Sequence, residues 1–245
     1  GGSKGYNKFI YEVEQFEEDD SDSIEFSRLS PNMEQGFPGN LDISVTYTLT
    51  ADNALVIEYL AVSDKDTIVN LTNHSYFNLA GHNSGSILDH KLMIDADKFT
   101  PTDDDLIPTG EMKTVEGTPM DFRKMKKIGQ DIDADYEPLK QAGGYDHNYV
   151  LSNSRAEVQK VAEMIEEKSG RVMEVYTDMP GMQLYTANFL KSEKGKGGVV
   201  YEKRDGVCFE TQYFPDSCNK PEFPSCILKA GDEYDYVTVY KFTVK

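Results

Sequence analysis

Apolar and polar residues alternate in steps of two along much of this chain. Within residues 42–50, every second position is apolar: Ile43, Val45, Tyr47 and Leu49. Successive side chains of a β-strand point to opposite faces, so this alternation predicts a strand with one buried face. Other strand-like segments are short and rich in β-branched or aromatic residues: ALVIEYLAVS, TIVNLTNH, RVMEVYTD, MQLYTANFL, GVCFETQYF and YDYVTVYKFTV. Turn signals such as FPGN, GHNSG and KAGDE separate them, which favours an all-β antiparallel sandwich or barrel over βαβ units.

One segment is ambiguous by its pattern. The run AEVQKVAEMIEEKSG places four small or apolar residues at helical spacing, Val158, Val161, Ala162 and Ile165. The same run can instead form one arm of a hairpin that turns at EKSG and returns as RVMEVYT. The residues alone favour neither reading.

Length and charge narrow the class of protein. With 245 residues and 38% hydrophobic residues, the chain can bury a sizeable core, and one domain over residues 1–245 is the simplest expectation. No apolar run approaches the roughly 20 residues of a membrane-spanning helix. The net charge of −18 disfavours nucleic acid and anionic lipid as partners and fits a neutral small molecule.

The cysteines predict a reducing, cytoplasmic setting. An odd number without a secretory leader is typical of free thiols, here Cys208, Cys218 and Cys226. We expect no metal site, because the cysteines lack the close spacing of zinc ligands. The DIDAD run also has Tyr136 and Ala142 where a calcium loop requires Gly and Glu.

Four polar residues in strand-like segments are candidates for chemistry. His74 lies in LTNHSYFNLAGH, where neighbouring hydrogen-bonding groups can fix one ring tautomer, although a lone histidine is more often structural. Asp146 follows two glycines in GGYDHNYVL and either caps a turn or accepts ligand hydroxyls. Gln183 in MPGMQLYTANF suits a hydroxyl as donor and acceptor, but it can equally be solvated.

The fourth candidate, Glu210, lies in the middle of the apolar segment GVCFETQYF. By alternation its side chain shares a face with Cys208 and Gln212. Either it points into solvent, or it is desolvated and has a raised pKa that suits a general base.

Four motifs in order, NLTNHSYFNLAG, GGYDHNYVL, PGMQLYTANF and ETQYFPDSCNKPEFPSCILKAGDEY, resemble the aldose 1-epimerase (galactose mutarotase) family. The resemblance implies a large antiparallel β-sandwich, or supersandwich, with an open sugar groove. It implies an isomerase that interconverts the α and β anomers of galactose, glucose and similar aldohexoses without a cofactor. It also implies that the segment before SGR is a strand, so a hairpin is expected there.

The same resemblance assigns roles to residues. His74 is expected to donate a proton and Glu210 to accept one. Asp146 and Gln183 are expected to bind sugar hydroxyls, and Ser75 and Tyr76 to line the same groove. His147, although it lies in a matched motif, is not expected to be the acid.

Members of the family normally carry a further N-terminal portion with an arginine and a histidine that contribute to sugar binding. The numbered chain starts at a Gly-Gly pair that follows that histidine in the family. We therefore expect the family's N-terminal strands to be missing or separate, and sheet edges to be left unpaired.

Two other functions compete with the epimerase. A non-catalytic sugar-binding or sugar-sensing protein would keep the groove without turnover. A glycosidase would use Asp146 and Glu210 as its two carboxylates, but this mechanism gives His74 no role.

Overall fold

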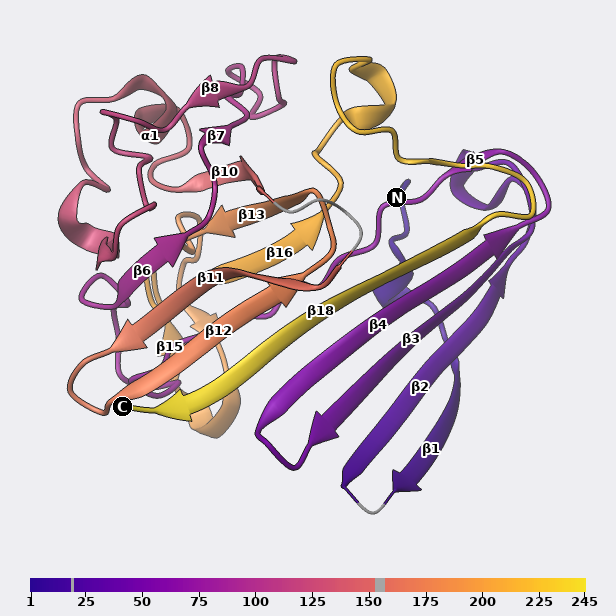
Figure 1. The fold of residues 1–245 in the computed structure, drawn as a ribbon, viewed down its shortest axis with the longest axis horizontal. Helices are drawn as coiled ribbons and strands as arrows, with labels where there is room; N and C mark the ends of the chain where they lie inside the picture. Colours follow the sequence, from indigo (N-terminus) through magenta and orange to yellow (C-terminus); the bar gives the residue numbers. More distant parts are fainter. Residues whose placement is uncertain (19, 153–156) are drawn as a thin grey trace.

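Two antiparallel sheets form the fold in this computed structural model, which describes residues 1–18, 20–152 and 157–245 (Figure 1). The larger sheet has the strand order β1-β2-β3-β4-β18-β12-β11-β6-β9. Its strands are β1 (Glu12–Glu18), β2 (Ser21–Ser30), β3 (Leu41–Thr50), β4 (Ala54–Ser63), β18 (Glu233–Val244), β12 (Arg171–Thr177), β11 (Gln159–Glu166), β6 (Lys91–Ile94) and β9 (Lys126–Lys127).

The smaller sheet has five strands in the order β16-β13-β10-β7-β8. They are β16 (Cys208–Gln212), β13 (Gly181–Tyr185), β10 (Asp146–Val150), β7 (Lys98–Phe99) and β8 (Lys113–Thr114). Two short strand pairs are β14 (Glu193–Lys194) with β15 (Val200–Tyr201), and β17 (Ile227–Leu228) with β5 (Thr67–Ile68). The described helices are α1 (Glu137–Gln141) and five 3-10 turns, η1 (Tyr6–Lys8), η2 (Glu34–Gly36), η3 (Ile128–Gln130), η4 (Lys196–Gly198) and η5 (Ser217–Asn219).

The ambiguous segment is a hairpin, as the family resemblance implied. β11 and β12 pair antiparallel, with Glu163 opposite Glu174. β11 is also hydrogen-bonded to β6 on its other side, and side chains on both of its faces are buried, including Val161, Ala162 and Met164. The register with β12 shifts between Lys160 and Ala162, so a β-bulge at Val161 sets two apolar residues in succession and breaks the period-two pattern, which explains why the sequence imitates a helix.

The core lies between the two sheets. In β4 the alternation is clear, since Ile57, Tyr59 and Ala61 are buried. Across the interface, the Tyr240 hydroxyl of β18 donates to the Phe209 carbonyl of β16 at 2.6 Å. Burial of the two inner faces therefore holds the five-stranded sheet against the nine-stranded one.

The predicted alternation of residues 42–50 is only partly matched by burial. Ile43 is 2% exposed, whereas Leu49 on the same face is 59% exposed. In Figure 1 β13 and β16 of the smaller sheet lie beside β11, and the lower ends of β2, β3 and β4 extend well away from them. That end of the apolar face consequently has no second layer among the described residues.

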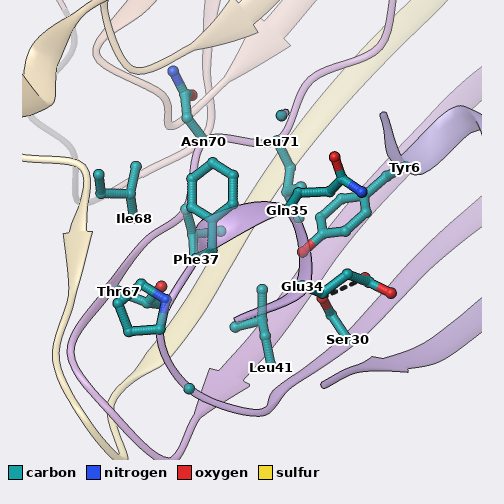
Figure 2. A pocket seen from close by; sticks show the side chains of 14 residues that line it. Tyr6, Ser30, Glu34, Gln35, Phe37, Leu41, Thr67, Ile68, Asn70 and Leu71 are labelled. Atoms are coloured by element: carbon teal, nitrogen blue, oxygen red, sulfur yellow. Dashed lines mark hydrogen bonds between the residues drawn. The ribbon is translucent and has the colours of Figure 1, made fainter. Parts of the chain in front are cut away.

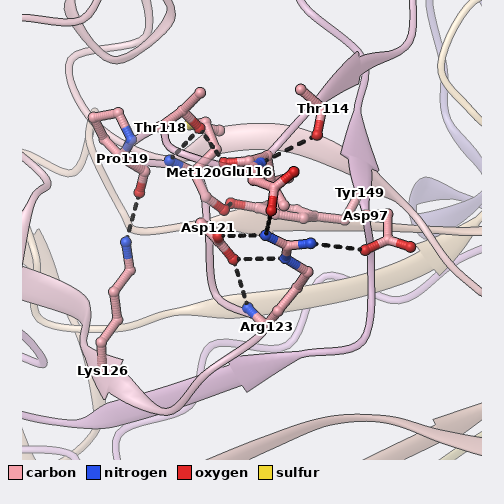
Figure 3. A network of polar contacts seen from close by, with 11 residues as sticks. Asp97, Thr114, Glu116, Thr118, Pro119, Met120, Asp121, Arg123, Lys126 and Tyr149 are labelled. Atoms are coloured by element: carbon pink, nitrogen blue, oxygen red, sulfur yellow. Dashed lines mark hydrogen bonds and ion pairs between the residues drawn. The ribbon is translucent and has the colours of Figure 1, made fainter.

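A polar network holds the segment that covers β10 (Figure 3). Arg123 donates to Asp121 Oδ2 at 2.8 Å and to Asp97 Oδ1 at 3.2 Å. Beside this network, the buried Tyr149 of β10 donates from its hydroxyl to the Met120 carbonyl at 3.1 Å. These contacts fix the position of β10, which carries Asp146.

A cavity of about 170 Å³ lies between η2, β5 and the first residues of the chain (Figure 2). Phe37, Leu41 and Leu71 are among its lining residues, and the Thr67 hydroxyl is buried without a hydrogen-bond partner. None of the candidate site residues lines this cavity. Among the described residues, no helix is long and apolar enough to cross a membrane.

Candidate active site

His74 and Glu210, which are far apart in sequence, meet at the edge of the smaller sheet. The Nε2 atom of His74 lies 3.4 Å from Oε1 of Glu210. The His74 side chain is 52% exposed, whereas that of Glu210 is 12% exposed. The pair therefore combines an accessible imidazole with a carboxylate that is largely removed from water.

The segment that carries His74 is fixed by its neighbour Asn73. The buried Asn73 side chain donates from Nδ2 to the hydroxyl of Tyr240 at 3.0 Å and to that of Tyr59 at 3.3 Å. Asn73 Oδ1 accepts the backbone N–H of Ser75 at 3.4 Å. The polar cluster in this segment thus anchors the backbone on the core, which leaves His74 projecting outward.

The strand register of the smaller sheet places five side chains on one face. Gln183 pairs with Glu210, while Tyr185 pairs with both Cys208 and Asp146. Because strand side chains alternate, these five residues point the same way, and the intervening residues point into the core. The Gln183 amide Nε2 donates to Asp146 Oδ1 at 2.8 Å, so Gln183 orients this carboxylate.

Burial dominates the electrostatics of this face. It raises the pKa of Glu210 to about 8, and the negative charge of Asp146 adds to the effect. Burial also raises the pKa of Asp146, opposed by the Gln183 hydrogen bond and by the nearby His74. Of the two readings of Glu210 from sequence, the desolvated one is correct, since the residue is only 9% exposed.

Aromatic rings surround the His74 imidazole. The Tyr76 ring lies 5.1 Å from it, and the Tyr185 ring lies 5.8 Å from it, between centroids. Ser75 and Tyr76 are both exposed, so they are open to a ligand. Tyr185 was not among the predicted ligands, although its two-residue spacing from Gln183 is the signal that could have identified it.

Arg204 is a buried cation that the sequence did not reveal. Its guanidinium donates to Asn188 Oδ1 at 2.7 Å and to the Gly143 carbonyl at 2.7 Å. Gly144 has a φ of +141°, and a Cβ at this position would lie 2.1 Å from Arg204 Nη1. Gly144 is therefore required so that the backbone can pass Arg204 before β10 begins at Asp146.

The other histidines are placed away from this chemistry. His147 is fully buried on the opposite face of β10, and burial lowers its pKa to about 4. His90 is buried and accepts the Leu79 backbone N–H at Nε2. His82 contacts the Tyr201 hydroxyl through Nδ1 at 3.0 Å.

The side chains of His74, Cys208 and Glu210 are also potential metal ligands, because one donor atom from each lies within 4.8 Å of the others. However, Cys208 contacts the ring at Nδ1, whereas Glu210 contacts it at Nε2. These two nitrogens diverge from the ring, so Cys208 and Glu210 contact different nitrogens of His74 in the observed arrangement. The observed arrangement suits proton transfer better than metal coordination.

Comparison with known proteins places the chain in a family. The sequence profile of the aldose 1-epimerases matches residues 1–241. The chain belongs to the aldose 1-epimerase family. It is 46% identical to galactose mutarotase from Bos taurus over 245 residues, which are 100% of this chain and 68% of that protein. It is 38% identical to aldose 1-epimerase from Escherichia coli over 245 residues, 99% of this chain and 69% of that protein.

Solved structures of other family members have the same fold. Galactose 1-epimerase from Lactobacillus acidophilus superimposes with a TM-score of 0.85 at 27% identity, covering 97% of this chain and 68% of that one. An aldose epimerase homologue from C. elegans gives a TM-score of 0.83 at 32% identity, covering 98% and 70%. The predicted antiparallel β-sandwich of the aldose 1-epimerases is therefore confirmed.

Proposed function

We propose that this aldose 1-epimerase interconverts the α and β anomers of an aldohexose by acid–base opening and closure of the sugar ring, with His74 and Glu210 as its acid and base. Its relatives at 38–46% identity are galactose mutarotases and aldose 1-epimerases, which supports this isomerase activity. The observation that carries the residue assignment is the 3.4 Å separation between His74 Nε2 and Glu210 Oε1.

Ring opening needs an acid and a base close together, because both reacting oxygens are bonded to the anomeric carbon. Glu210 removes the proton from the anomeric hydroxyl while His74 protonates the ring oxygen. The bond between the anomeric carbon and the ring oxygen breaks, and a free aldehyde forms. Each positioned group of this kind typically accelerates a reaction by about 10²–10⁴-fold.

Ring closure is the reverse of opening on the other face of the aldehyde. Rotation about the bond between the first and second carbons presents that face to the ring hydroxyl. His74 then takes back the hydroxyl proton, and Glu210 returns its proton to the carbonyl oxygen as the ring closes. Both residues regain their starting protonation states, so no further reactant is consumed.

The remaining residues of the site hold the sugar. Asp146 accepts hydrogen bonds from sugar hydroxyls, and Gln183, which keeps one amide N–H free of Asp146, can donate a second contact. Ser75, Tyr76 and Tyr185 border the imidazole and supply hydroxyl groups and ring surface. Galactose and glucose are the substrates we propose, since the site presents neutral and acidic groups rather than a basic cluster for a sugar phosphate.

Polarimetry of freshly dissolved α-galactose tests the proposal. The protein should accelerate the decay of optical rotation, and His74→Asn should reduce this acceleration by about 10²–10⁴-fold. His82→Asn is the matched control, because His82 contacts Tyr201 rather than Glu210, and it should retain the parental rate. Sugar binding without acceleration would instead favour a sensor, and near-parental rates in His74→Asn would refute its role as the acid.

A further inference from the structure

The His74 imidazole lies between a carboxylate and a thiol. Glu210 contacts the ring at Nε2, and the Sγ atom of Cys208 lies 3.5 Å from Nδ1. Cys208 and Glu210 are two residues apart on β16, so both side chains point to the same face. Within the part of the chain that the structure describes, Cys208 is the hydrogen-bond partner of Nδ1.

The environment of Cys208 determines what this contact is. The residue is 0% exposed, and burial raises the pKa of its thiol, with the charges of Glu210 and Asp146 adding to the effect. The thiol therefore keeps its proton at neutral pH, and a protonated thiol is a weak hydrogen-bond donor. A ring nitrogen that accepts this bond must itself carry no proton.

We propose that Cys208 is a positioning residue, whose S–H donates to His74 Nδ1 and so holds the ring proton on Nε2, the nitrogen that faces Glu210. This inference rests on the proposed function, because it specifies which ring nitrogen delivers the proton. The neutral ring donates Nε2–H to the sugar ring oxygen, and the S–H hydrogen bond to Nδ1 stabilises the imidazolate that forms until Nε2 takes the proton back at ring closure. It also fixes the ring rotation. An imidazole turned over by 180° would present carbon, rather than Nε2–H, to the reacting oxygen.

The exposure of His74 makes such a restraint necessary. Its side chain is 52% exposed, so packing alone holds the ring weakly. The rings of Tyr76 and Tyr185 restrict its tilt, but they do not distinguish between its two nitrogens. The thiol does distinguish them, since it places a donor on one side, opposite the acceptor oxygen of Glu210.

Kinetics of matched cysteine variants provide the first test. Cys208→Ala should lower kcat about tenfold, about 1.4 kcal/mol, while KM stays within about twofold, because the loss falls on proton transfer rather than on sugar binding. Cys208→Ser keeps a donor and should recover much of that loss. Cys226→Ala removes the other buried thiol, which lies outside the site, and should leave kcat unchanged.

Nitrogen-15 NMR of the imidazole provides the second test and does not depend on activity. At a pH where His74 is neutral, the parental protein should show a protonated Nε2 and an unprotonated, hydrogen-bonded Nδ1. The nitrogen-15 chemical shift of Nδ1 should move toward that of a free imine nitrogen in Cys208→Ala but not in Cys226→Ala.

The two tests together separate the possible failures. A proton on Nδ1 in the parental protein overturns the inference, as does an Nδ1 shift that Cys208→Ala leaves unchanged. A kcat in Cys208→Ala equal to the parental value also overturns it, as does a serine variant slower than the alanine variant. If the parental protein has no mutarotase activity, the proposed function fails, while the NMR result still decides whether the thiol orients the ring.

Discussion

Asp146 lies close enough to Glu210 for its negative charge to raise the pKa of the Glu210 carboxyl. The two residues belong to β10 and β16, the strands on either side of β13, and Gln183 of β13 donates to Asp146. The carboxylate that we propose as a sugar ligand therefore also raises the pKa of the carboxyl that we propose as the base.

The pH dependence of kcat/KM should reflect this coupling. Glu210 must be ionised to act as a base, so kcat/KM should rise with pH through the pKa of about 8 and level off above it. Asp146→Asn removes the repelling charge and should move this limb to lower pH, even as it weakens sugar binding. Initial rates between about pH 6 and about pH 9, corrected for spontaneous mutarotation, measure this limb in the parental protein and in the variant. An unshifted limb in the variant would contradict the coupling.

Glu210→Gln should abolish most of the activity while stabilising the fold at alkaline pH. The folded-state pKa of about 8 lies above the ordinary value of 4.5 for a glutamate carboxyl. The favourable contribution of the protonated carboxyl is therefore fully present below about pH 4.5 and is lost as the pH rises through about 8. Above that pH the parental protein buries a charge that the amide does not carry. We expect a gain of a few kcal/mol there, measured by urea unfolding, and little gain at about pH 5.

Gln183→Leu should act mainly on sugar binding. The change removes the donor to Asp146 Oδ1 and leaves a half-buried carboxylate with less support. Hydrogen bonds to charged groups contribute about 1.5–3 kcal/mol, so KM should rise by about tenfold or more with a smaller change in kcat. Steady-state polarimetry separates the two constants. A fall in kcat at constant KM would show that Gln183 acts in the chemical step instead.

Gly144→Ala should destabilise the protein more than Gly143→Ala. Both glycines have positive φ, so each substitution introduces backbone strain. At Gly143 the added Cβ meets no atom within 4 Å, whereas at Gly144 it meets Arg204 and Asn188. We expect losses of about 1–2 kcal/mol for Gly143→Ala and clearly more for Gly144→Ala, from thermal or urea unfolding. Equal losses would show that Arg204 moves aside without penalty.

The sequence predicted the strands and singled out His74, Asp146, Gln183 and Glu210 as candidates, for reasons that are local. Period-two alternation identified β3 and β4, and a glutamate inside an apolar run marked Glu210 as unusual. The proximity of His74 to Glu210 came from family resemblance, because no local pattern reports contacts across 136 positions of chain. Arg204 was missed because its hydrogen-bond partners are a backbone carbonyl, an amide and a hydroxyl that are brought together only by the fold.

The contact between Cys208 and His74 could not be predicted from the sequence for a related reason. The sequence predicted that Cys208 would share a face with Glu210, and it predicted free thiols, as the structure shows for all three cysteines. The side chain that lies over this face of β16 depends on the path of residues 69–76. The hydrogen bonds of Asn73 determine that path.

On β16, Phe209 and Glu210 are adjacent and face opposite layers. A deletion or insertion of one residue in this strand would exchange their positions, moving the aromatic ring to the solvent side and a carboxylate into the apolar interior. Length changes here are therefore expected to remove folding and catalysis in a single step, whereas loops such as residues 82–86 can vary in length. Natural variants of this chain should consequently accumulate insertions at the hairpin ends and none between Cys208 and Gln212.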